Sequence, residues 1–339
     1  MSAPSVDRFR PKIARSFLFD PLLPDACLPA LIGPARLWYH TTAVSNALFE
    51  AMRPRQWTKN VFVFAGIIFA KKLTDVPSLL LSVAAFCLFC LLSSSVYIIN
   101  DLLDAEQDRQ HPTKKDRPIA SGRLSRPTAI AAAVTLAAVG IGLAFAVSVA
   151  FAVVSIVYLV LNLLYTYSLK HLVILDVLSI AVFFVLRAAA GAEAIAVPIS
   201  HWLLICTVLL ALFIALSKRR HELVLLEENA SSHRASLTEY TPYLLDQMIA
   251  VVTASTLMAY ILYTVDARTV SEVGSTRLLY TVPCVIYGIL RYLYLVHQKG
   301  EGGDPDRIVV SDRPFIINML VWAAIAAAVV YWHWPPGLS

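Results

Sequence analysis

The chain has 339 residues, of which 58% are hydrophobic and only 15% are charged. An average soluble domain is about 45–50% apolar and about 25% charged. A mean hydropathy of +0.68 leaves too little polar surface to cover a water-soluble globule of this size. These values exclude a soluble enzyme, a disordered protein and a nucleic-acid-binding module, and they indicate a polytopic membrane protein.

Long unbroken apolar runs without alternation predict membrane helices rather than barrel strands. Taken in chain order, we predict an all-α bundle of nine transmembrane helices over residues 54–70, 76–101, 127–147, 149–168, 172–196, 200–217, 243–265, 277–297 and 314–334. The first is unusual because Lys59 and Asn60 lie inside it, and the third and fourth have almost no loop between them. We expect an N-terminal cytoplasmic or interfacial arm over residues 1–50 and one transmembrane domain over residues 51–335.

The lysines and arginines predict the orientation of the bundle. The N-terminal segment and the loops after helices two, four, six and eight hold 21 of the 28, whereas the opposite loops hold 4. This asymmetry predicts that the N-terminus and the even loops are cytoplasmic. We therefore expect a multi-pass protein of the plasma (inner) membrane whose active-site cavity opens toward the cytoplasm.

A cluster of acidic residues lies at the predicted cytoplasmic end of the second helix. Asn100 begins it, and Asp101, Asp104 and Asp108 follow at spacings of three and four residues, which place them on one helical face. Three carboxylates in successive turns repel one another, so we expect a cation among them. Hard oxygen ligands favour Mg²⁺, which commonly keeps positions open for substrate phosphates. The alternative is a solvated helix end without a ligand.

A basic segment follows the acidic cluster directly and includes Lys114 and Arg117. A metal-bridged diphosphate needs carboxylates for the metal and cationic groups for the remaining phosphate oxygens. The chain contains no G-x-x-x-x-G-K-[ST] loop, so we do not expect a P-loop nucleotide site. The alternative is that these cations only fix the topology of the chain.

These motifs resemble those of a known family. Asn-Asp-x-x-Asp-x-x-x-Asp at the end of helix two, followed by Lys-x-Asp-Arg-Pro-Ile-Ala-Ser-Gly, is similar to the UbiA superfamily of intramembrane prenyltransferases, over roughly residues 50–335. The segment Tyr165-Thr-Tyr167-Ser-Leu-Lys170 resembles the family's Tyr-x-x-x-Lys segment. Aromatic prenyltransferases of this family carry a second acidic motif after helix six, but here that position reads Ser-Lys218-Arg219-Arg220-His-Glu. We therefore expect a phosphate site there rather than a second metal site.

In one branch of the superfamily, basic residues also stand at the position of the second acidic motif. Its members also carry motifs similar to Arg53-Pro-Arg-Gln-Trp-Thr-Lys59-Asn60 and to Asp312-Arg313-Pro314. The resemblance to this decaprenyl-phosphate phosphoribosyltransferase branch implies Mg²⁺ as cofactor. It also implies transfer of a 5-phosphoribosyl group from 5-phosphoribosyl 1-diphosphate to a polyprenyl (decaprenyl) phosphate, toward the arabinose donor for cell-wall arabinan. The length of the isoprenoid and whether the protein forms a homo-oligomer stay open.

The expected reaction assigns roles to the remaining polar residues. Two anionic substrates need cationic groups to bind them, and Lys59, Lys170, Lys218 and Arg219 are the candidates. Asp176 and Arg187 are buried charges of the predicted fifth helix, and a separation of about 16 Å along the axis means that they do not pair. We expect Asp176 to approach the ribose hydroxyls and Arg187 to stabilise the bundle. The predicted substrate-binding residues are thus Lys59, Asn60, Asn100, Lys114, Arg117, Tyr165, Tyr167, Lys170, Asp176, Lys218, Arg219 and Arg220, beside the predicted catalytic and metal ligands Asp101, Asp104 and Asp108.

Two other functions compete with this one. A prenyltransferase acting on an aromatic acceptor predicts a second acidic motif after helix six, and the chain lacks that motif. A transporter of phosphorylated lipids predicts internal repeats and charges near the bilayer midplane, whereas the charges of this chain cluster at the predicted cytoplasmic ends.

Overall fold

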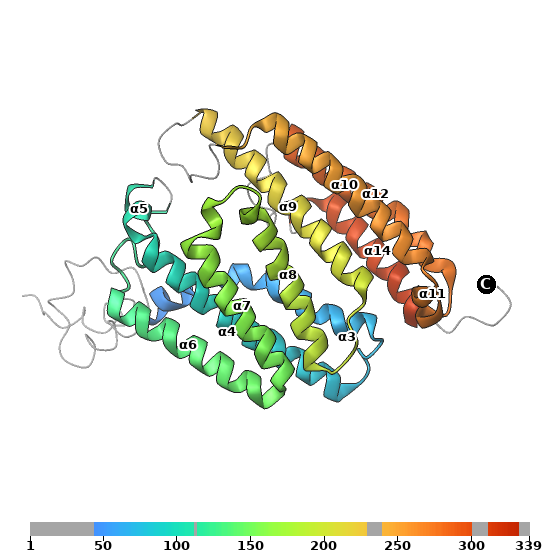
Figure 1. Cartoon of the computed structure of the whole chain (residues 1–339), viewed down its shortest axis with the longest axis horizontal. Helices are drawn as coiled ribbons and strands as arrows, with labels where there is room; N and C mark the ends of the chain where they lie inside the picture. Colours follow the sequence, from blue (N-terminus) through green and yellow to red (C-terminus); the bar gives the residue numbers. More distant parts are fainter. Residues whose placement is uncertain (1–43, 112–113, 229–238, 300–310, 332–339) are drawn as a thin grey trace, which may run out of the picture. The chain divides into compact units, whose positions relative to one another are not determined.

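The computed structural model describes residues 44–111, 114–228, 239–299 and 311–331, and within these ranges every regular element is helical and no strand occurs (Figure 1). Eight of the described helical segments are long and apolar enough to cross a membrane. The all-α multi-pass fold is therefore confirmed. These segments are α4 (Val76–Leu103), α6 (Arg126–Val147), α7 (Val149–Tyr167), α8 (Leu175–Ala194), α9 (His201–Glu228), α10 (Pro242–Val265), η5 (Thr276–Thr281) with α12 (Val282–Gln298), and α14 (Arg313–Tyr331).

The first predicted span differs from a regular α-helix. Residues Pro54–Phe64 form the 3₁₀ helix η2, and only Ala65–Phe69 form an α-helix, α3. The prediction of nine membrane helices is therefore not confirmed for the described residues, in which eight qualify. A 3₁₀ helix rises about 2.0 Å per residue and an α-helix about 1.5 Å, so the two pieces together extend over about 30 Å, the thickness of the hydrocarbon core of a bilayer.

Small residues explain how this first segment packs. Gly191 of α8 lies against the backbone of η2, where an added Cβ atom would lie 1.8 Å from the carbonyl oxygen of Val63. A Cβ atom added at Gly66 of α3 would likewise lie 2.9 Å from backbone atoms of Ala192. Backbones that approach this closely tolerate only glycine, a contact typical of packed membrane helices.

Most of the remaining boundaries agree with the hydrophobic pattern, but α9 continues to Glu228, beyond the predicted end of that span at residue 217. Lys218, Arg219 and Arg220 therefore lie within a helix and not in the predicted loop. Ser148 alone separates α6 from α7, and its hydroxyl accepts a hydrogen bond from the amide of Phe151 at 3.0 Å as an N-cap. The structure adds two short helices that were not predicted, α5 (Ala105–Gln110) and α11 (Ala267–Val273). The helix α11 begins at the capping side chain of Asp266 and ends at Gly274, which adopts a left-handed φ of 77°.

The chain divides into two compact units. The first comprises residues up to Arg53 together with Tyr97–Ala132, and the second comprises Pro54–Val96 and the chain from Ala133 onward. The helices α4 and α6 contribute residues to both units. The predicted division into an arm over residues 1–50 and a domain over residues 51–335 stays a prediction, because residues 1–43 lie outside the described part.

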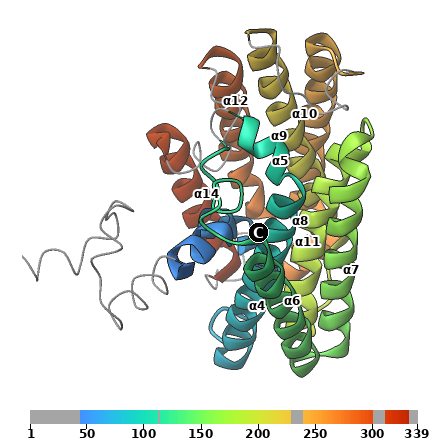
Figure 2. The same cartoon turned by 90° about the vertical axis from the view of Figure 1, so that its left-hand side faces the viewer.

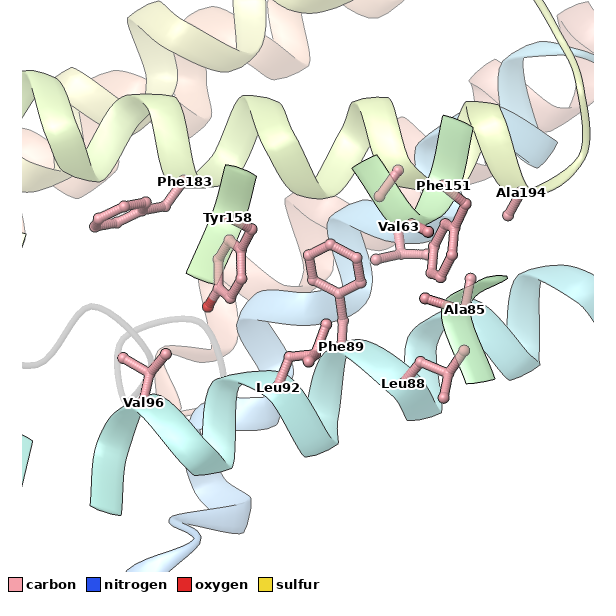
Figure 3. Packing of buried hydrophobic residues seen from close by; sticks show 13 residues of the cluster. Val63, Ala85, Leu88, Phe89, Leu92, Val96, Phe151, Tyr158, Phe183 and Ala194 are labelled. Atoms are coloured by element: carbon pink, nitrogen blue, oxygen red, sulfur yellow. The ribbon is translucent and has the colours of Figure 1, made fainter. Parts of the chain in front are cut away.

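The second unit is built around α8. This helix packs against α7, α9, η2 and α3, and Figures 1 and 2 both show it between α7 and α9. Figure 3 shows the buried core on one side of it, where the ring of Phe89 lies 5.1 Å from that of Tyr158 and 5.9 Å from that of Phe151. The ring of Phe183 completes this core, since it meets Tyr158 edge to face at 6.0 Å.

A second buried cluster joins α9, α10 and α12. Its centre is the contact of Phe213 with Tyr292, whose ring centroids lie 5.1 Å apart, and Leu245 is fully buried beside them. This cluster lies next to the polar ends of the same helices, so it fixes the positions of the charged residues described below.

Candidate active site

The acidic cluster lies in the first unit, but it is not one continuous helical face. The helix α4 ends at Leu103, and Asp104 is the residue that precedes the separate short helix α5. Asp101 and Asp108 are buried, with 2% and 4% of their surface exposed, whereas Asp104 is half-buried. The predicted single helical face is therefore interrupted at Asp104, where the chain passes from α4 to α5, and Asp104 is less buried than the other two carboxylates.

Arginines neutralise the two buried carboxylates. Nη1 of Arg117 lies 2.6 Å from Oδ2 of Asp108 and 3.2 Å from Oδ1 of Asp101. Arg53 also forms an ion pair with Oδ1 of Asp101, and its guanidinium lies over the ring of Tyr97 at 5.4 Å. The sequence-based expectation that only a bound cation could offset these carboxylates is thus corrected, since the chain supplies two guanidinium groups of its own.

The backbone at Arg53 is strained in a way that places its side chain. Its φ of 53° lies in the left-handed region, which non-glycine residues seldom adopt. The amide of Arg53 is held by the carbonyl of Glu50 at 3.0 Å. Such strain persists only where the surroundings impose it. The ion pair between Arg53 and Asp101 is one contact that holds this residue.

The basic segment after α5 is a tightly bonded turn. Arg123 donates to both carboxylate oxygens of Glu50, at 2.7 and 2.9 Å, and so joins this segment to the helix over residues 44–51. Gly122 adopts a φ of 80°, which suits glycine, and the amide of Leu124 returns to the carbonyl of Pro118 at 2.8 Å. This turn carries Arg117 to the acidic cluster. The predicted residues Asn100 and Lys114 are half-buried in the same unit.

One titratable side chain borders this turn. Partial burial and the nearby charge of Lys114 hold the pKa of His111 below its usual value of 6.5. His111 is therefore neutral at physiological pH and does not add to the positive charge of the segment.

The donor chemistry of the acidic cluster suits a hard divalent cation. Two buried carboxylate oxygens, of Asp101 and Asp108, face one common cationic nitrogen of Arg117, so this position favours positive charge. Within the described ranges no three His, Cys, Asp or Glu side chains are already grouped around a metal position. Mg²⁺ bound here would have to take over carboxylate contacts that Arg117 now makes, with Asp104 as the nearby third carboxylate of the motif.

The second unit holds a buried ion pair that the sequence did not predict as a pair. Nε of Arg219 lies 2.8 Å from Oδ2 of Asp176, and both side chains are at most 3% exposed. Arg219 also pairs with Glu222, while the hydroxyl of Tyr240 donates to Oδ1 of Asp176 at 3.0 Å. Burial raises the pKa of Tyr240 to about 12, so its hydroxyl remains a donor at physiological pH. Two predicted substrate-binding residues, Asp176 and Arg219, thus meet directly.

The other basic residues of this stretch of α9 lie in different surroundings. Arg220 pairs with Asp246 of α10, and Nε2 of His297 of α12 lies 3.3 Å from the same carboxylate. Lys218, which directly precedes the two arginines in the sequence, is half-buried. Two of the three predicted cations, Arg219 and Arg220, are thus balanced by carboxylates of the same unit, and the phosphate site predicted here stays a prediction.

Asn60 and Arg187 form a buried polar network. Nε of Arg187 donates to Oδ1 of Asn60 at 2.8 Å, and the amide of Asn60 donates to Cys90 and Ser93 of α4. Arg187 also donates to the hydroxyl of Tyr158 at 2.8 Å. The predicted structural role of Arg187 fits these contacts. The same contacts give Asn60, predicted to bind substrate, the role of joining η2 to α4 and α8, because it is fully buried.

Arg187 and Asp176 do not pair with each other, as predicted, since each has its own partners in the second unit. The remaining predicted residues, Lys59, Tyr165, Tyr167 and Lys170, differ in exposure. Tyr167 is 63% exposed, whereas Tyr165 is half-buried and meets Phe183 edge to face at 5.5 Å. Lys59 and Lys170 are half-buried, the latter in the short 3₁₀ helix η3 (Leu169–His171).

The late Asp-Arg-Pro motif has a structural explanation. Oδ1 of Asp312 accepts the amide of Phe315 at 2.9 Å and so caps α14, while Arg291 of α12 donates to both carboxylate oxygens, at 3.2 and 2.8 Å. These hydrogen bonds hold the pKa of Asp312 below its usual value. The motif therefore joins α12 to the start of α14.

Comparison with known proteins identifies the family. The model of the UbiA prenyltransferase family matches residues 60–319. The chain belongs to this family. It is 35% identical to the decaprenyl-phosphate phosphoribosyltransferase of Corynebacterium glutamicum over 309 residues, which cover 86% of this chain and 92% of that protein. It is 34% identical to the enzyme of the same name from Mycolicibacterium smegmatis over 301 residues, 84% of this chain and 93% of the relative.

A solved structure confirms the UbiA fold. The structure of a UbiA homolog from Archaeoglobus fulgidus bound to GPP and Mg²⁺ superposes with a TM-score of 0.63 at 17% identity, over 84% of this chain and 99% of that one. The UbiA resemblance predicted from the motifs is thus confirmed over most of the chain.

The sequence did not predict three polar residues that contact the buried carboxylates Asp101 and Asp176 or the arginine Arg219. Arg53 stands in a motif that the sequence displays, but nothing in the spacing shows that it pairs with Asp101. Glu222 lies three residues after Arg219, a spacing at which side chains of a helix meet. Tyr240 carries no local signal, since it lies 64 residues from the Asp176 carboxylate that it contacts.

Proposed function

We propose that this protein transfers a 5-phosphoribosyl group from 5-phosphoribosyl 1-diphosphate to a polyprenyl phosphate, with decaprenyl phosphate as the expected acceptor. The observation that carries the proposal is the similarity to decaprenyl-phosphate phosphoribosyltransferases over more than four fifths of the chain, at 34–35% identity. The product would serve the synthesis of the decaprenylphosphoryl-arabinose donor for cell-wall arabinan.

The basic stretch in the second half of α9 supports this reaction over the transfer of a prenyl group to an aromatic acceptor. An acidic motif there would serve a second metal site, but the chain has Lys218, Arg219 and Arg220 instead. Cationic groups suit a substrate with several phosphate groups, since each charged hydrogen bond to a phosphate oxygen stabilises the complex. Both proposed substrates carry phosphate.

The proposed reaction breaks one bond and forms one. The bond between C1 of the ribose and the diphosphate oxygen breaks, and the diphosphate leaves with the bonding electrons. An oxygen of the acceptor phosphate forms the new bond to C1, so the acceptor becomes a phosphodiester. The acceptor phosphate is already anionic at neutral pH, so the reaction requires no general base.

The acidic cluster would serve the diphosphate of the donor. Asp101, Asp104 and Asp108 are the residues proposed to hold Mg²⁺, which when bound supplies positive charge to the leaving diphosphate. Arg117 and Arg53, which contact the carboxylates now, carry guanidinium groups that match phosphate oxygens as well as carboxylates. Charge neutralisation and positioning would then supply most of the rate enhancement.

Basic residues of the second unit are likewise proposed to bind phosphate. Lys59, Lys170 and Lys218, which are half-buried, are the lysines proposed for this role. Arg219 is held by Asp176, and we propose that Asp176 also directs the ribose hydroxyls. Tyr165 and Tyr167 precede Lys170 in the segment that resembles the family motif.

The membrane fits the proposed acceptor. The isoprenoid of the acceptor stays in the bilayer, and the phosphate of the acceptor lies at the surface, where a soluble donor arrives. The excess of lysine and arginine in alternate loops supports a plasma-membrane protein with a cytoplasmic N-terminus and cytoplasmic site.

One assay tests the proposal. The purified protein in detergent is incubated with Mg²⁺, radiolabelled 5-phosphoribosyl 1-diphosphate and polyprenyl phosphate, and the label is followed into the lipid fraction. We expect label transfer and release of diphosphate, both lost with EDTA. Transfer of a prenyl group from prenyl diphosphate to an aromatic acid, without phosphoribosyl transfer, would establish the aromatic prenyltransferase instead. Movement of unmodified lipid phosphate across the vesicle membrane, without phosphoribosyl transfer, would favour a transporter.

A further inference from the structure

The segment that joins η3 to α8 contains a strained turn. Ile174 has a φ of 69° and a ψ of −45°, and the amide of Leu175 donates to the carbonyl of Val173 at 2.8 Å. This is a γ-turn of the rare form with a positive central φ. A β-branched residue in this conformation is a genuine outlier, because its side chain crowds the backbone. The turn therefore needs contacts from outside the segment to persist.

Tyr240 supplies that outside contact. Its hydroxyl accepts the amide of Ile174 at 2.7 Å and donates to Oδ1 of Asp176 at 3.0 Å. Tyr240 lies just before α10 and is buried, with 3% of its surface exposed. One hydroxyl therefore fixes both the strained residue and the carboxylate that follows it in the first turn of α8.

The chain of contacts continues to the basic cluster. Oδ2 of Asp176 holds Nε of Arg219 at 2.8 Å, and Arg219 pairs with Glu222 at its other end. The hydroxyl of Tyr240 thus orients the carboxylate that in turn orients a guanidinium. The same turn follows directly after η3, which carries Lys170.

We infer that Tyr240 is a positioning residue for phosphate binding. By holding the γ-turn at Ile174 and the Asp176 carboxylate together, it sets the direction of Arg219 and the path of the segment that carries Lys170. The inference rests on the proposed function for the role of Arg219 and Lys170. The geometry of the turn does not depend on that function.

The test uses Tyr240→Phe, which keeps the ring and removes the hydroxyl. We expect the KM for one of the two phosphorylated substrates to rise about 5- to 30-fold, as the loss of one or two hydrogen bonds implies, while kcat changes less. Amide hydrogen exchange of residues 168–176 should accelerate in the same variant, without substrate. The matched control is Tyr243→Phe, a tyrosine that is 75% exposed three residues later, for which both readouts should equal those of the wild type.

A second substitution separates the turn from general packing. Glycine adopts a positive φ without strain, and the side chain of Ile174 is 45% exposed, so Ile174→Gly removes little packing. In the Tyr240→Phe background it should lower the raised KM at least about threefold. A double variant as impaired as Tyr240→Phe would overturn the role of the turn, and wild-type kinetics and exchange in Tyr240→Phe would overturn the inference as a whole. If the wild type transfers no phosphoribosyl group, the proposed function fails, and the exchange measurement alone still decides whether Tyr240 holds the turn.

Discussion

The substitution Asp101→Asn tests the acidic cluster most directly. It keeps the shape of the side chain and removes the charge that faces Arg53 and Arg117. Loss of a direct carboxylate ligand removes several kcal/mol of charge stabilisation at the leaving group, and each 1.36 kcal/mol is tenfold in rate. We therefore expect the turnover to fall at least about 100-fold, and the affinity for Mg²⁺ to fall with it.

The structure also predicts a cost in stability for this variant. Asp101 is buried, but both arginine side chains are 28% exposed and relax partly into solvent. The expected loss is about 1.5–3 kcal/mol, the range for a hydrogen bond to a charged group. The melting temperature in detergent should thus fall by no more than about 10 °C, so the variant remains folded at the assay temperature.

The assay measures label transfer at increasing Mg²⁺ concentration, together with the melting temperature. Glu106→Gln is the matched control, since this carboxylate lies in the same acidic segment but is 72% exposed and pairs only at the surface with Arg109. We expect its turnover to stay within about twofold of the wild type. Turnover of Asp101→Asn within threefold of the wild type at saturating Mg²⁺ would refute the metal-binding role of the cluster.

Four other substitutions test separate parts of the site. Asp108→Asn should cost about 10–100-fold in turnover if it supports the metal rather than binding it directly, measured in the same assay. Lys218→Gln should raise the KM for one phosphorylated substrate about 10- to 100-fold, and unchanged kinetics would mean that it only orients the chain. Arg187→Met should lower stability by about 1–3 kcal/mol with KM unchanged, and a rise in KM without a change in melting temperature would contradict its structural role. The lowered pKa of Asp312 means that its charged form stabilises the fold above the usual aspartate pKa, about 3.9, and that this contribution is lost as the pH falls toward the lowered value. The difference in melting temperature between the wild type and Asp312→Asn should therefore be full at pH 7 and shrink only below about pH 4.

Most of the fold follows from the length of the apolar runs, because a helix is the structure that satisfies every backbone group within one membrane-crossing segment. The predicted span over residues 149–168 matches α7 (Val149–Tyr167), and that over residues 127–147 matches α6 (Arg126–Val147). The first segment could not be predicted in detail. The 3₁₀ helix η2 contains Val63, which lies close to Gly191 of α8. Gly191 is distant in the sequence, so the residues of the first segment alone do not predict this contact.

The composition of the candidate site was predictable, but its pairing was not. The acidic motif and the basic segments were identified from residue type and spacing, which are local properties. Which acid meets which base depends on contacts across the fold, such as that between Arg219 and Asp176, 43 residues apart. The bend at Asp104 was missed for a related reason: helical spacing predicts a common face only while the helix continues, and α4 ends one residue earlier.

Within each unit, aspartates are paired with arginines, and this pairing has one physical reason. Asp101, Asp176 and Asp312 each accept hydrogen bonds from an arginine. A guanidinium placed in a poorly solvated region without a partner would be costly, and a carboxylate partner reduces that cost while no ligand is bound. Two oxygens of a phosphate can accept the same bidentate pair of hydrogen bonds as a carboxylate, so an arriving phosphate competes for a donor that is already ordered. Such a site exchanges one anion for another instead of creating and removing an unpaired charge, and this suits an enzyme whose two proposed substrates are both anionic.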